Sequence, residues 1–227
     1  TPRSAVRTTL SPIDERALQE SRGQTLVLTI DSVIQEAAER ALAAAVEKHN
    51  ARSGVVLIQR TKTGALLAAA AEPSFDNNTF SKSSAAARRP RFLTDPMEPG
   101  STAKCLTFAM LFERNRIRQE ELINCHGGRM RIHGRWVVDS PGHTLYWATP
   151  KEIFRWSSNV GTVEAAQRVT NEEYYETLTS FGIGRPAGID LPGESGGILR
   201  PVSQWTNMSR SSLPMGYEFA ATPLQIL

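Results

Sequence analysis

Apolar residues in the first quarter of the chain change from a strand-like to a helix-like period. Residues 24–30 alternate between polar and apolar side chains, which predicts a short strand. Beyond Asp31, a good N-terminal cap, small apolar residues recur at three- and four-residue spacing from Val33 to Ala45. We therefore expect a helix that ends near Lys48, with an alanine-rich face that packs closely on a sheet.

Two apolar runs then predict an antiparallel hairpin. Residues 54–60 and 65–71 are both strand-like, and the intervening Lys62-Thr63-Gly64 has the composition of a tight turn. The rest of the chain is mainly helical in pattern, with a long loop over residues 73–90 and a small hairpin within residues 125–143. Helices are predicted over residues 101–114, near Gln119, from Pro150, over residues 160–168 and 171–180, and from Thr222.

Composition and charge indicate an ordinary globular protein. The chain has 227 residues, of which 40% are hydrophobic and 22% charged, enough for one large domain or two small ones. Lys and Arg number 26 against 23 Asp and Glu, and the single basic cluster, residues 88–91, has no interleaved aromatic residues. We expect an exposed loop there and no nucleic-acid partner. No run of 18 apolar residues occurs, so neither a membrane span nor a signal peptide is predicted.

The two cysteines, Cys105 and Cys125, do not form a Cys-x-x-Cys pair. Cys105 is expected to pack inward as a small apolar residue. Cys125, His126, His133 and His143 fit no standard metal-ligand spacing. We therefore expect neither a metal nor a cofactor.

Candidate chemistry begins at Ser101 and Lys104. Pro99 and Gly100 interrupt any preceding helix, so Ser101 falls in the first turn of a new one. Three helical positions correspond to about 300° of rotation and about 4.5 Å of rise, so both side chains share one face and a neutral lysine can take the serine proton. The helix N-terminus adds free N–H groups where an oxyanion would form. Taken alone, the pattern also fits a serine cap and a surface lysine.

Ser157-Ser158-Asn159 is the second candidate element. Residues two apart in a turn can present their side chains to the same side. The Ser157 hydroxyl could then relay a proton between Lys104 and a leaving group, and the Asn159 amide could bond both a substrate carbonyl and Lys104. By itself this stretch equally fits a polar helix cap.

Together, Ser-x-x-Lys and Ser-x-Asn resemble the first two of the three active-site motifs of penicillin-binding proteins and serine β-lactamases. Their flanking motifs resemble, in order, those of class B penicillin-binding proteins, the monofunctional peptidoglycan transpeptidases. These motifs are Leu28-Thr29-Ile30-Asp31, residues 63–68, Glu98-Pro99-Gly100-Ser101-Thr102, residues 157–161, residues 188–194 and Thr222-Pro223-Leu224-Gln225. The resemblance covers residues 24–227 and implies an α+β fold, with an antiparallel sheet flanked by helices plus an all-helical part. Residues 1–23 would be a linker or the tail of an N-terminal pedestal domain.

The resemblance also implies a reaction and a location. Ser101 would attack the D-Ala-D-Ala bond of a peptidoglycan stem peptide, with Lys104 as base and with Ser157 and Asn159 as catalytic and substrate-binding groups. An amine of a neighbouring stem peptide would resolve the acyl-enzyme, and β-lactams would also acylate Ser101. Asn159 followed by Val-Gly is more typical of the septal branch than of the elongation branch. The protein partners would be cell-division or elongation membrane proteins, and the catalytic domain would be periplasmic, held at the bacterial inner membrane by an N-terminal anchor absent from this chain.

The third motif of the family, Lys-Thr-Gly, is expected beyond the end of the chain. Lys62-Thr63-Gly64 spells it but precedes Ser101, and Gly64 there meets a turn requirement. In the family this motif supplies a cation, substrate-carboxylate bonds and the second oxyanion donor, and losing one such donor typically costs about 100- to 1000-fold in rate. We therefore expect a fold that is incomplete at the C-terminus, with only two of five sheet strands, and a fragment that alone is inactive and poorly folded.

Two alternatives stay open on the sequence. A β-lactamase or β-lactam sensor would share both motifs, although no residue for a deacylating water is indicated. A catalytically dead scaffold that binds division proteins would also retain them.

Overall fold

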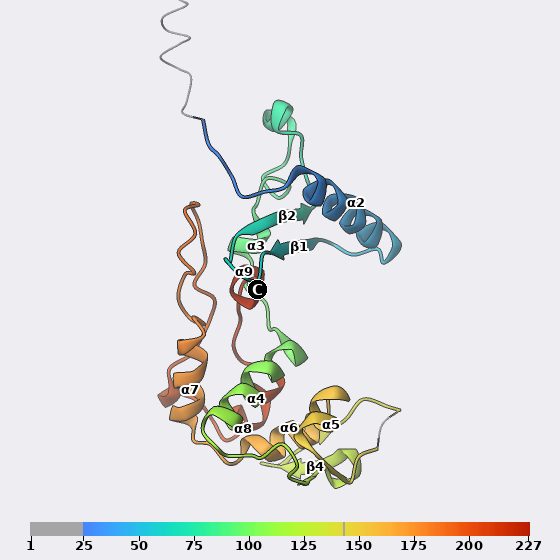
Figure 1. The fold of residues 1–227 in the computed structure, drawn as a ribbon, viewed down its shortest axis with the longest axis vertical. Helices are drawn as coiled ribbons and strands as arrows, with labels where there is room; N and C mark the ends of the chain where they lie inside the picture. Colours follow the sequence, from blue (N-terminus) through green and yellow to red (C-terminus); the bar gives the residue numbers. More distant parts are fainter. Residues whose placement is uncertain (1–24, 143) are drawn as a thin grey trace, which may run out of the picture.

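The computed structural model describes residues 25–142 and 144–227, which form two lobes (Figure 1). An upper lobe holds the N-terminal hairpin, and a lower lobe holds most of the helices. The prediction of a linker over residues 1–23 lies outside the described residues, as do residue 24 and His143. None of the helices formed by the described residues is long and apolar enough to cross a bilayer.

The upper lobe is a two-stranded antiparallel sheet with a helix packed on it. β1 (Gly54–Gln59) pairs with β2 (Leu66–Glu72), and α2 (Ser32–Lys48) packs against both strands. The side chain of Asp31 caps α2 by accepting from two backbone N–H groups of its first turn. Gly64 lies in the hairpin turn with φ +75°, a conformation that favours glycine. The predicted helix, hairpin and turn are confirmed.

Residues 25–30 do not form the predicted strand, which was wrong. Leu26 and Val27 are 83% and 92% exposed, so the alternating apolar residues cover no core. Only the Thr29 hydroxyl reaches the hairpin here, by donating to the carbonyl oxygen of Leu66. The segment therefore runs along the edge of the sheet without joining it.

The outer edge of β2 is occupied by α2 instead of by another strand. The Gln35 amide accepts from the backbone N–H of Ala69 at 2.8 Å and donates to its carbonyl oxygen at 3.1 Å. The N–H of Asp31 donates to the Leu67 carbonyl oxygen at 2.9 Å. Among the described residues β1 pairs only with β2, so Leu57, which lies opposite Ala69, faces an edge with no partner strand.

The lower lobe is built around α4 (Lys104–Glu113) and its preceding 3₁₀ turn, η2 (Gly100–Ala103). The other elements of this lobe are β3 (Ile123–Asn124), η3 (His126–Gly128), β4 (Arg129–Ile132), β5 (Arg135–Val138), β6 (Trp147–Ala148), α5 (Pro150–Arg155), α6 (Asn159–Ala166), α7 (Asn171–Ser180), η4 (Val202–Gln204), α8 (Ser209–Ser212) and η5 (Leu213–Met215). Elements between or beside the lobes are η1 (Asn77–Lys82), α3 (Arg91–Thr94) and α9 (Pro223–Ile226), and α9 packs on α3 and β1. The β4–β5 hairpin and the helices predicted from residues 150, 160, 171 and 222 are confirmed.

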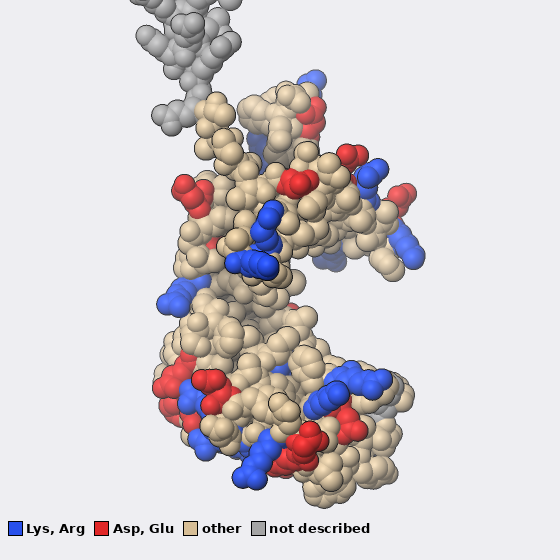
Figure 2. Space-filling model, viewed as in Figure 1, with Lys and Arg blue, Asp and Glu red and all other residues tan. Residues whose placement is uncertain are grey.

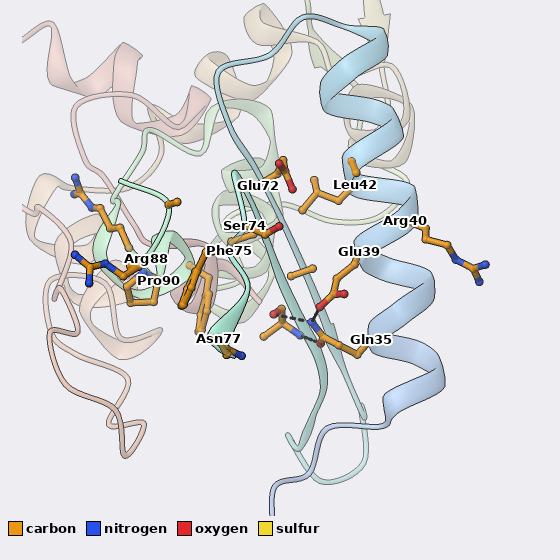
Figure 3. A pocket seen from close by; sticks show the side chains of 17 residues that line it. Gln35, Glu39, Arg40, Leu42, Glu72, Ser74, Phe75, Asn77, Arg88 and Pro90 are labelled. Carbon is orange, nitrogen blue, oxygen red and sulfur yellow. Dashed lines mark hydrogen bonds between the residues drawn. The ribbon is translucent and has the colours of Figure 1, made fainter. Parts of the chain in front are cut away.

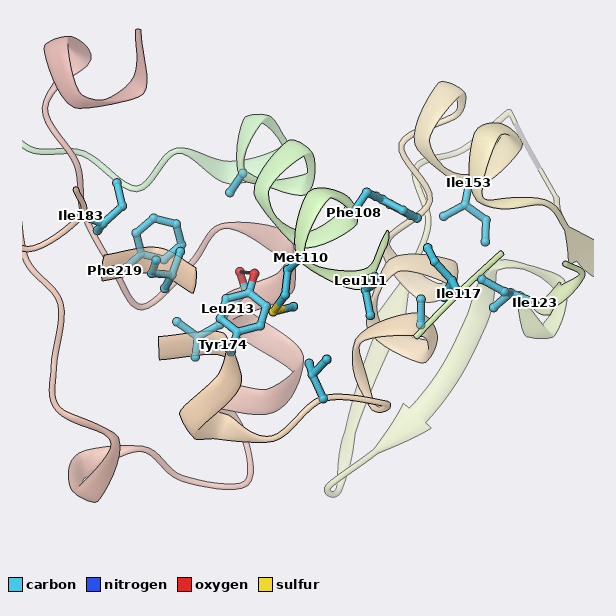
Figure 4. Close-up of a cluster of buried hydrophobic side chains, with 14 of the residues drawn as sticks. Phe108, Met110, Leu111, Ile117, Ile123, Ile153, Tyr174, Ile183, Leu213 and Phe219 are labelled. Carbon is cyan, nitrogen blue, oxygen red and sulfur yellow. Dashed lines mark hydrogen bonds between the residues drawn. The ribbon is translucent and has the colours of Figure 1, made fainter. Parts of the chain in front are cut away.

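The main core lies where α4 meets α5, α6 and α7 (Figure 4). Phe108 and Leu111 of α4 are buried there. The buried hydroxyls of Tyr174 and Thr107 are hydrogen-bonded within this core, because Tyr174 bonds Thr107 at 2.7 Å and donates to the Leu213 carbonyl oxygen at 3.2 Å. This packing fixes the orientation of α4.

The helix predicted near Gln119 is wrong, because the structure has a turn there. Side chains of neighbouring segments hold this connection in place. The Glu121 carboxylate accepts from the backbone N–H of Arg118 at 3.2 Å and pairs with Arg168 at 2.7 Å.

Candidate active site

The turn before Ser101 is held by a segment more than a hundred residues later in the chain. Met97 and Ala221 exchange backbone hydrogen bonds at 2.9 and 3.0 Å, and the N–H of Gly100 donates to the Gly216 carbonyl oxygen at 3.0 Å. Gly216 has φ +85°, and a Cβ there would lie 1.9 Å from the Gly100 oxygen. Only glycine fits this contact, which sets the start of η2 and leaves the Ser101 side chain exposed.

Lys104 is buried, with only 1% of its surface exposed. Its Nζ donates to the Ser157 carbonyl oxygen at 2.6 Å, the Ser157 hydroxyl at 3.0 Å and Asn159 Oδ1 at 2.8 Å. These bonds use all three N–H groups of a protonated amine. Burial lowers the pKa of Lys104 from the usual 10.5 to about 8, although the nearby Asp139 carboxylate opposes this shift. The amine is therefore far easier to deprotonate than an exposed lysine.

The structure brings Lys104, Ser157 and Asn159 into direct contact and places Ser101 one turn earlier. The backbone N–H of Lys104 donates to the Ser101 carbonyl oxygen. Among the described residues the Ser101 hydroxyl has no hydrogen-bond partner, so the structure does not show the expected contact between its oxygen and the lysine amine. Hydrogen bonds of this kind are often long until substrate binds.

Ser157 has an unusual backbone conformation, with φ +52°. For a residue other than glycine this costs about 1–2 kcal/mol, so neighbouring contacts must hold it. The conformation turns the chain from α5 into α6 and directs both oxygens of Ser157 toward Lys104. Asn159 is fixed separately, because its Nδ2 donates to the Val138 carbonyl oxygen at 3.0 Å and leaves Oδ1 facing the lysine.

Asp139 belongs to the site but was not found from the sequence. It directly follows β5, and its Oδ2 accepts from the Ser158 hydroxyl at 2.7 Å while Oδ1 accepts from the Val160 N–H at 2.9 Å. Ser158 caps α6 by accepting from the Gly161 N–H. The only sequence signal was a carboxylate near the end of a weak strand, nineteen residues before Ser158.

The two cysteines differ in burial, and Cys105 does not lie where the sequence predicted. Cys105 is exposed, so the prediction that it packs inward is wrong: Lys104 and Thr107 take the buried positions on α4. Cys125 is buried beneath α6, where burial raises the pKa of its thiol to about 11. A Cβ on Gly161 would lie 2.9 Å from this sulfur, so glycine permits the close packing of α6.

Comparison with known proteins decides the family. The sequence profile described as "Penicillin binding protein transpeptidase domain" matches residues 54–227. The chain belongs to the penicillin-binding protein transpeptidase family. Penicillin-binding protein PbpB of Mycolicibacterium smegmatis is 34% identical over 205 residues, which are 90% of this chain and 32% of that protein. Peptidoglycan D,D-transpeptidase FtsI of Escherichia coli is 30% identical over 213 residues, or 94% of this chain and 36% of that protein.

The fold of the transpeptidase domain is likewise shared with solved structures. The TP domain of penicillin-binding protein 3 from Burkholderia pseudomallei superposes with a TM-score of 0.78 at 27% identity, covering 91% of this chain and 57% of that one. This agrees with the predicted α+β transpeptidase fold. The chain spans about a third of the length of the two curated relatives.

In two further motifs, residues 188–194 and 222–225, a side chain holds the local backbone through hydrogen bonds. The Glu194 carboxylate accepts from the N–H groups of Ala187 at 2.6 Å and Gly188 at 3.0 Å. The Gln225 Nε2 donates to three carbonyl oxygens, those of Gly182, Arg185 and Gly196. These residues fix the loop after α7 and the start of α9.

A separate hollow of about 530 Å³ lies in the upper lobe, between α2, β2 and residues 87–90 (Figure 3). The hydrogen bonds of Gln35 with Glu39 and Ala69 lie on one wall. None of Ser101, Lys104, Ser157 and Asn159 lines it.

Proposed function

We propose that this transpeptidase domain carries the acylation site of a peptidoglycan D,D-transpeptidase, with Ser101 as nucleophile. The observation that carries the proposal is the buried Lys104 amine, bonded to Ser157 and Asn159 and one turn from the exposed Ser101. The similarity to FtsI of Escherichia coli, named a peptidoglycan D,D-transpeptidase, supports the reaction class.

In the acylation step, Ser101 Oγ bonds to the carbonyl carbon of the penultimate D-Ala of a stem peptide. Its proton passes to the neutral Lys104 amine, which the lowered pKa makes accessible near neutral pH. The C–N bond to the terminal D-Ala then breaks, and the proton reaches the leaving amine through the Ser157 hydroxyl. The products are free D-Ala and a Ser101 ester.

Asn159 binds the donor peptide as well as the lysine. One Nδ2 hydrogen is bonded to the Val138 carbonyl oxygen, and the second is available for a substrate carbonyl. The Ser101 N–H lies in the first turn of η2, where N–H groups lack helical partners, and it contributes to oxyanion stabilisation.

The second half-reaction joins two stem peptides. An amine of a neighbouring stem peptide attacks the Ser101 ester, forms the cross-link and releases the serine hydroxyl. β-Lactams present a similar acyl group and acylate the same oxygen, but their leaving amine stays tethered. They therefore act as long-lived covalent ligands.

A role in division is the finer part of the proposal. Asn159 followed by Val160-Gly161, and the similarity to FtsI, support the septal branch over the elongation branch. The protein partners are then division membrane proteins, with elongation membrane proteins as the alternative. The domain acts on the periplasmic side of the bacterial inner membrane, where the peptidoglycan substrate lies. The assignment of residues 1–23 to a linker or pedestal tail stays a prediction.

The test is release of D-Ala from a synthetic D-Ala-D-Ala stem peptide by the full-length gene product, with an amine acceptor present. We expect a cross-linked product from the wild-type protein and none from Ser101→Ala. A β-lactam acyl-enzyme that persists for hours supports the transpeptidase, whereas turnover in seconds would indicate a β-lactamase. Rescue of a depleted strain by Ser101→Ala would instead indicate a division scaffold.

A further inference from the structure

The turn that carries Ser157 and Asn159 is held from outside by one carboxylate. Asp139 Oδ2 accepts from the Ser158 hydroxyl at 2.7 Å, and Oδ1 accepts from the Val160 N–H at 2.9 Å. The two bonds bracket Asn159. We propose that Asp139 is a positioning residue, whose carboxylate holds this turn so that Ser157 and Asn159 both face Lys104; this inference rests on the acylation role proposed above.

The turn needs such a support because Ser157 has φ +52°. A strained non-glycine residue persists only where surrounding contacts over-determine it. The Ser158 hydroxyl accepts from the Gly161 N–H at 2.9 Å, so its own proton is directed to Asp139. Ser158 therefore cannot rotate toward the lysine without losing both bonds, and the residues on either side keep their orientation.

Asp139 and its neighbour Val138 are themselves held by backbone contacts. The Asp139 N–H donates to the Gly128 carbonyl oxygen at 2.9 Å. Gly128 has φ +76°, and a Cβ there would lie 3.5 Å from the Asp139 carboxylate, in contact with it. The preceding Val138 carbonyl oxygen accepts from Asn159 Nδ2 at 3.0 Å. Residues 138 and 139 thus contact three consecutive residues at the start of α6.

The carboxylate also acts on charge in the site. Asp139 raises the pKa of Lys104, against the larger lowering caused by burial, and it raises the pKa of Cys125. The other carboxylates that act on Cys125 are Glu152 and Glu164, and neither acts on Lys104. Removal of the Asp139 charge should therefore lower the Lys104 pKa further while loosening the turn.

The test measures Ser101 acylation by a fluorescent penicillin across pH in the full-length protein. Asp139→Asn is expected to slow acylation about 10- to 100-fold, because small displacements in a reacting site have effects of this size, and to shift the midpoint of the pH profile downward. Ser158→Ala keeps the charge and is expected to slow acylation without shifting the midpoint. Asp139→Glu should restore the midpoint. Glu120→Gln removes an exposed carboxylate outside the site and should match wild type.

A second measurement keeps the inference separate from the proposed function. The Lys104 amine can be titrated by NMR with ¹³C-labelled lysine, assigned through Lys104→Arg, and this needs no turnover. If wild type is not acylated, the proposed function fails, but a lower Lys104 pKa in folded Asp139→Asn still supports the inference. Equal acylation rates and equal Lys104 pKa values in Asp139→Asn and wild type would overturn it.

Discussion

The Lys104 amine joins the two sequence motifs into one site. A buried lysine with three oxygen partners is stable in the protonated form, yet burial still brings its pKa to about 8. The unfolded chain keeps the ordinary value of 10.5, so the penalty for burying the charge is fully present below pH 8. It disappears as pH rises from 8 toward 10.5, and the folded state gains stability over that window.

The first prediction concerns the pH dependence of acylation. If neutral Lys104 is the base, the second-order rate of penicillin acylation should rise about tenfold from pH 7 to pH 9 and then level off, since the neutral fraction follows a pKa near 8. Stopped-flow labelling across this range measures it. A rate that is flat over the same interval would exclude Lys104 as the titrating base.

The second prediction uses the amide that faces this lysine. Asn159→Asp places a carboxylate where Oδ1 now accepts from Lys104 at 2.8 Å, which should raise the lysine pKa. The midpoint of the same pH profile should move upward by about one unit or more, with slower acylation at pH 7. Asn159→Gln, which adds no charge, is the control. An unchanged midpoint in Asn159→Asp would contradict the electrostatic account.

At the level of elements, the sequence was sufficient to predict helix starts that depend only on neighbouring residues in the chain. Helices α5, α7 and α9 each follow an N-cap threonine that forms a capping box, and their starts were predictable from that pattern. The strand over residues 24–30 failed because α2 occupies the edge it would have used. Asp139 was not predicted either, because its contacts with α6 depend on where β5 lies in the folded structure.

The third prediction concerns the close contact that sets the start of η2. Gly216 and Gly182 have nearly equal φ values, +85° and +86°, but a Cβ clashes with Gly100 only at Gly216. Gly182→Ala should therefore lower the free energy of unfolding by about 1–2 kcal/mol, the cost of the left-handed conformation alone. Gly216→Ala should cost about 4 kcal/mol or more and slow Ser101 acylation. Equal losses in chemical denaturation would show that the Gly216–Gly100 contact is not needed.

At the level of the whole molecule, the two lobes differ in how complete their packing is. The lower lobe has a closed core around α4, whereas β1 has a partner on one side only among the described residues. Basic and acidic side chains lie interspersed over both lobes on the face in Figure 2, which gives no continuous charged surface there. The main asymmetry is therefore the open edge of the sheet.

The fourth prediction compares the backbone amides of two residues that lie opposite each other in the hairpin. The Ala69 N–H donates to the Gln35 side chain, whereas the Leu57 N–H points to the open edge of β1. In the 227-residue chain, hydrogen exchange should be slow at Ala69 and fast at Leu57, and Gln35→Ala should make Ala69 fast. Slow exchange at Leu57 only in the full-length protein would show that a further segment pairs with β1. Equal protection of both amides in this chain would contradict the open edge.

The most direct test of the central claim is the site of penicillin attachment. The full-length protein is incubated with a fluorescent penicillin at pH 8, digested, and mapped by mass spectrometry. We predict one covalent adduct, on Ser101, that is absent in Ser101→Ala and strongly reduced in Lys104→Met. No adduct in the folded protein, or an adduct on Ser157 or another serine, would contradict the assignment of Ser101 as the nucleophile.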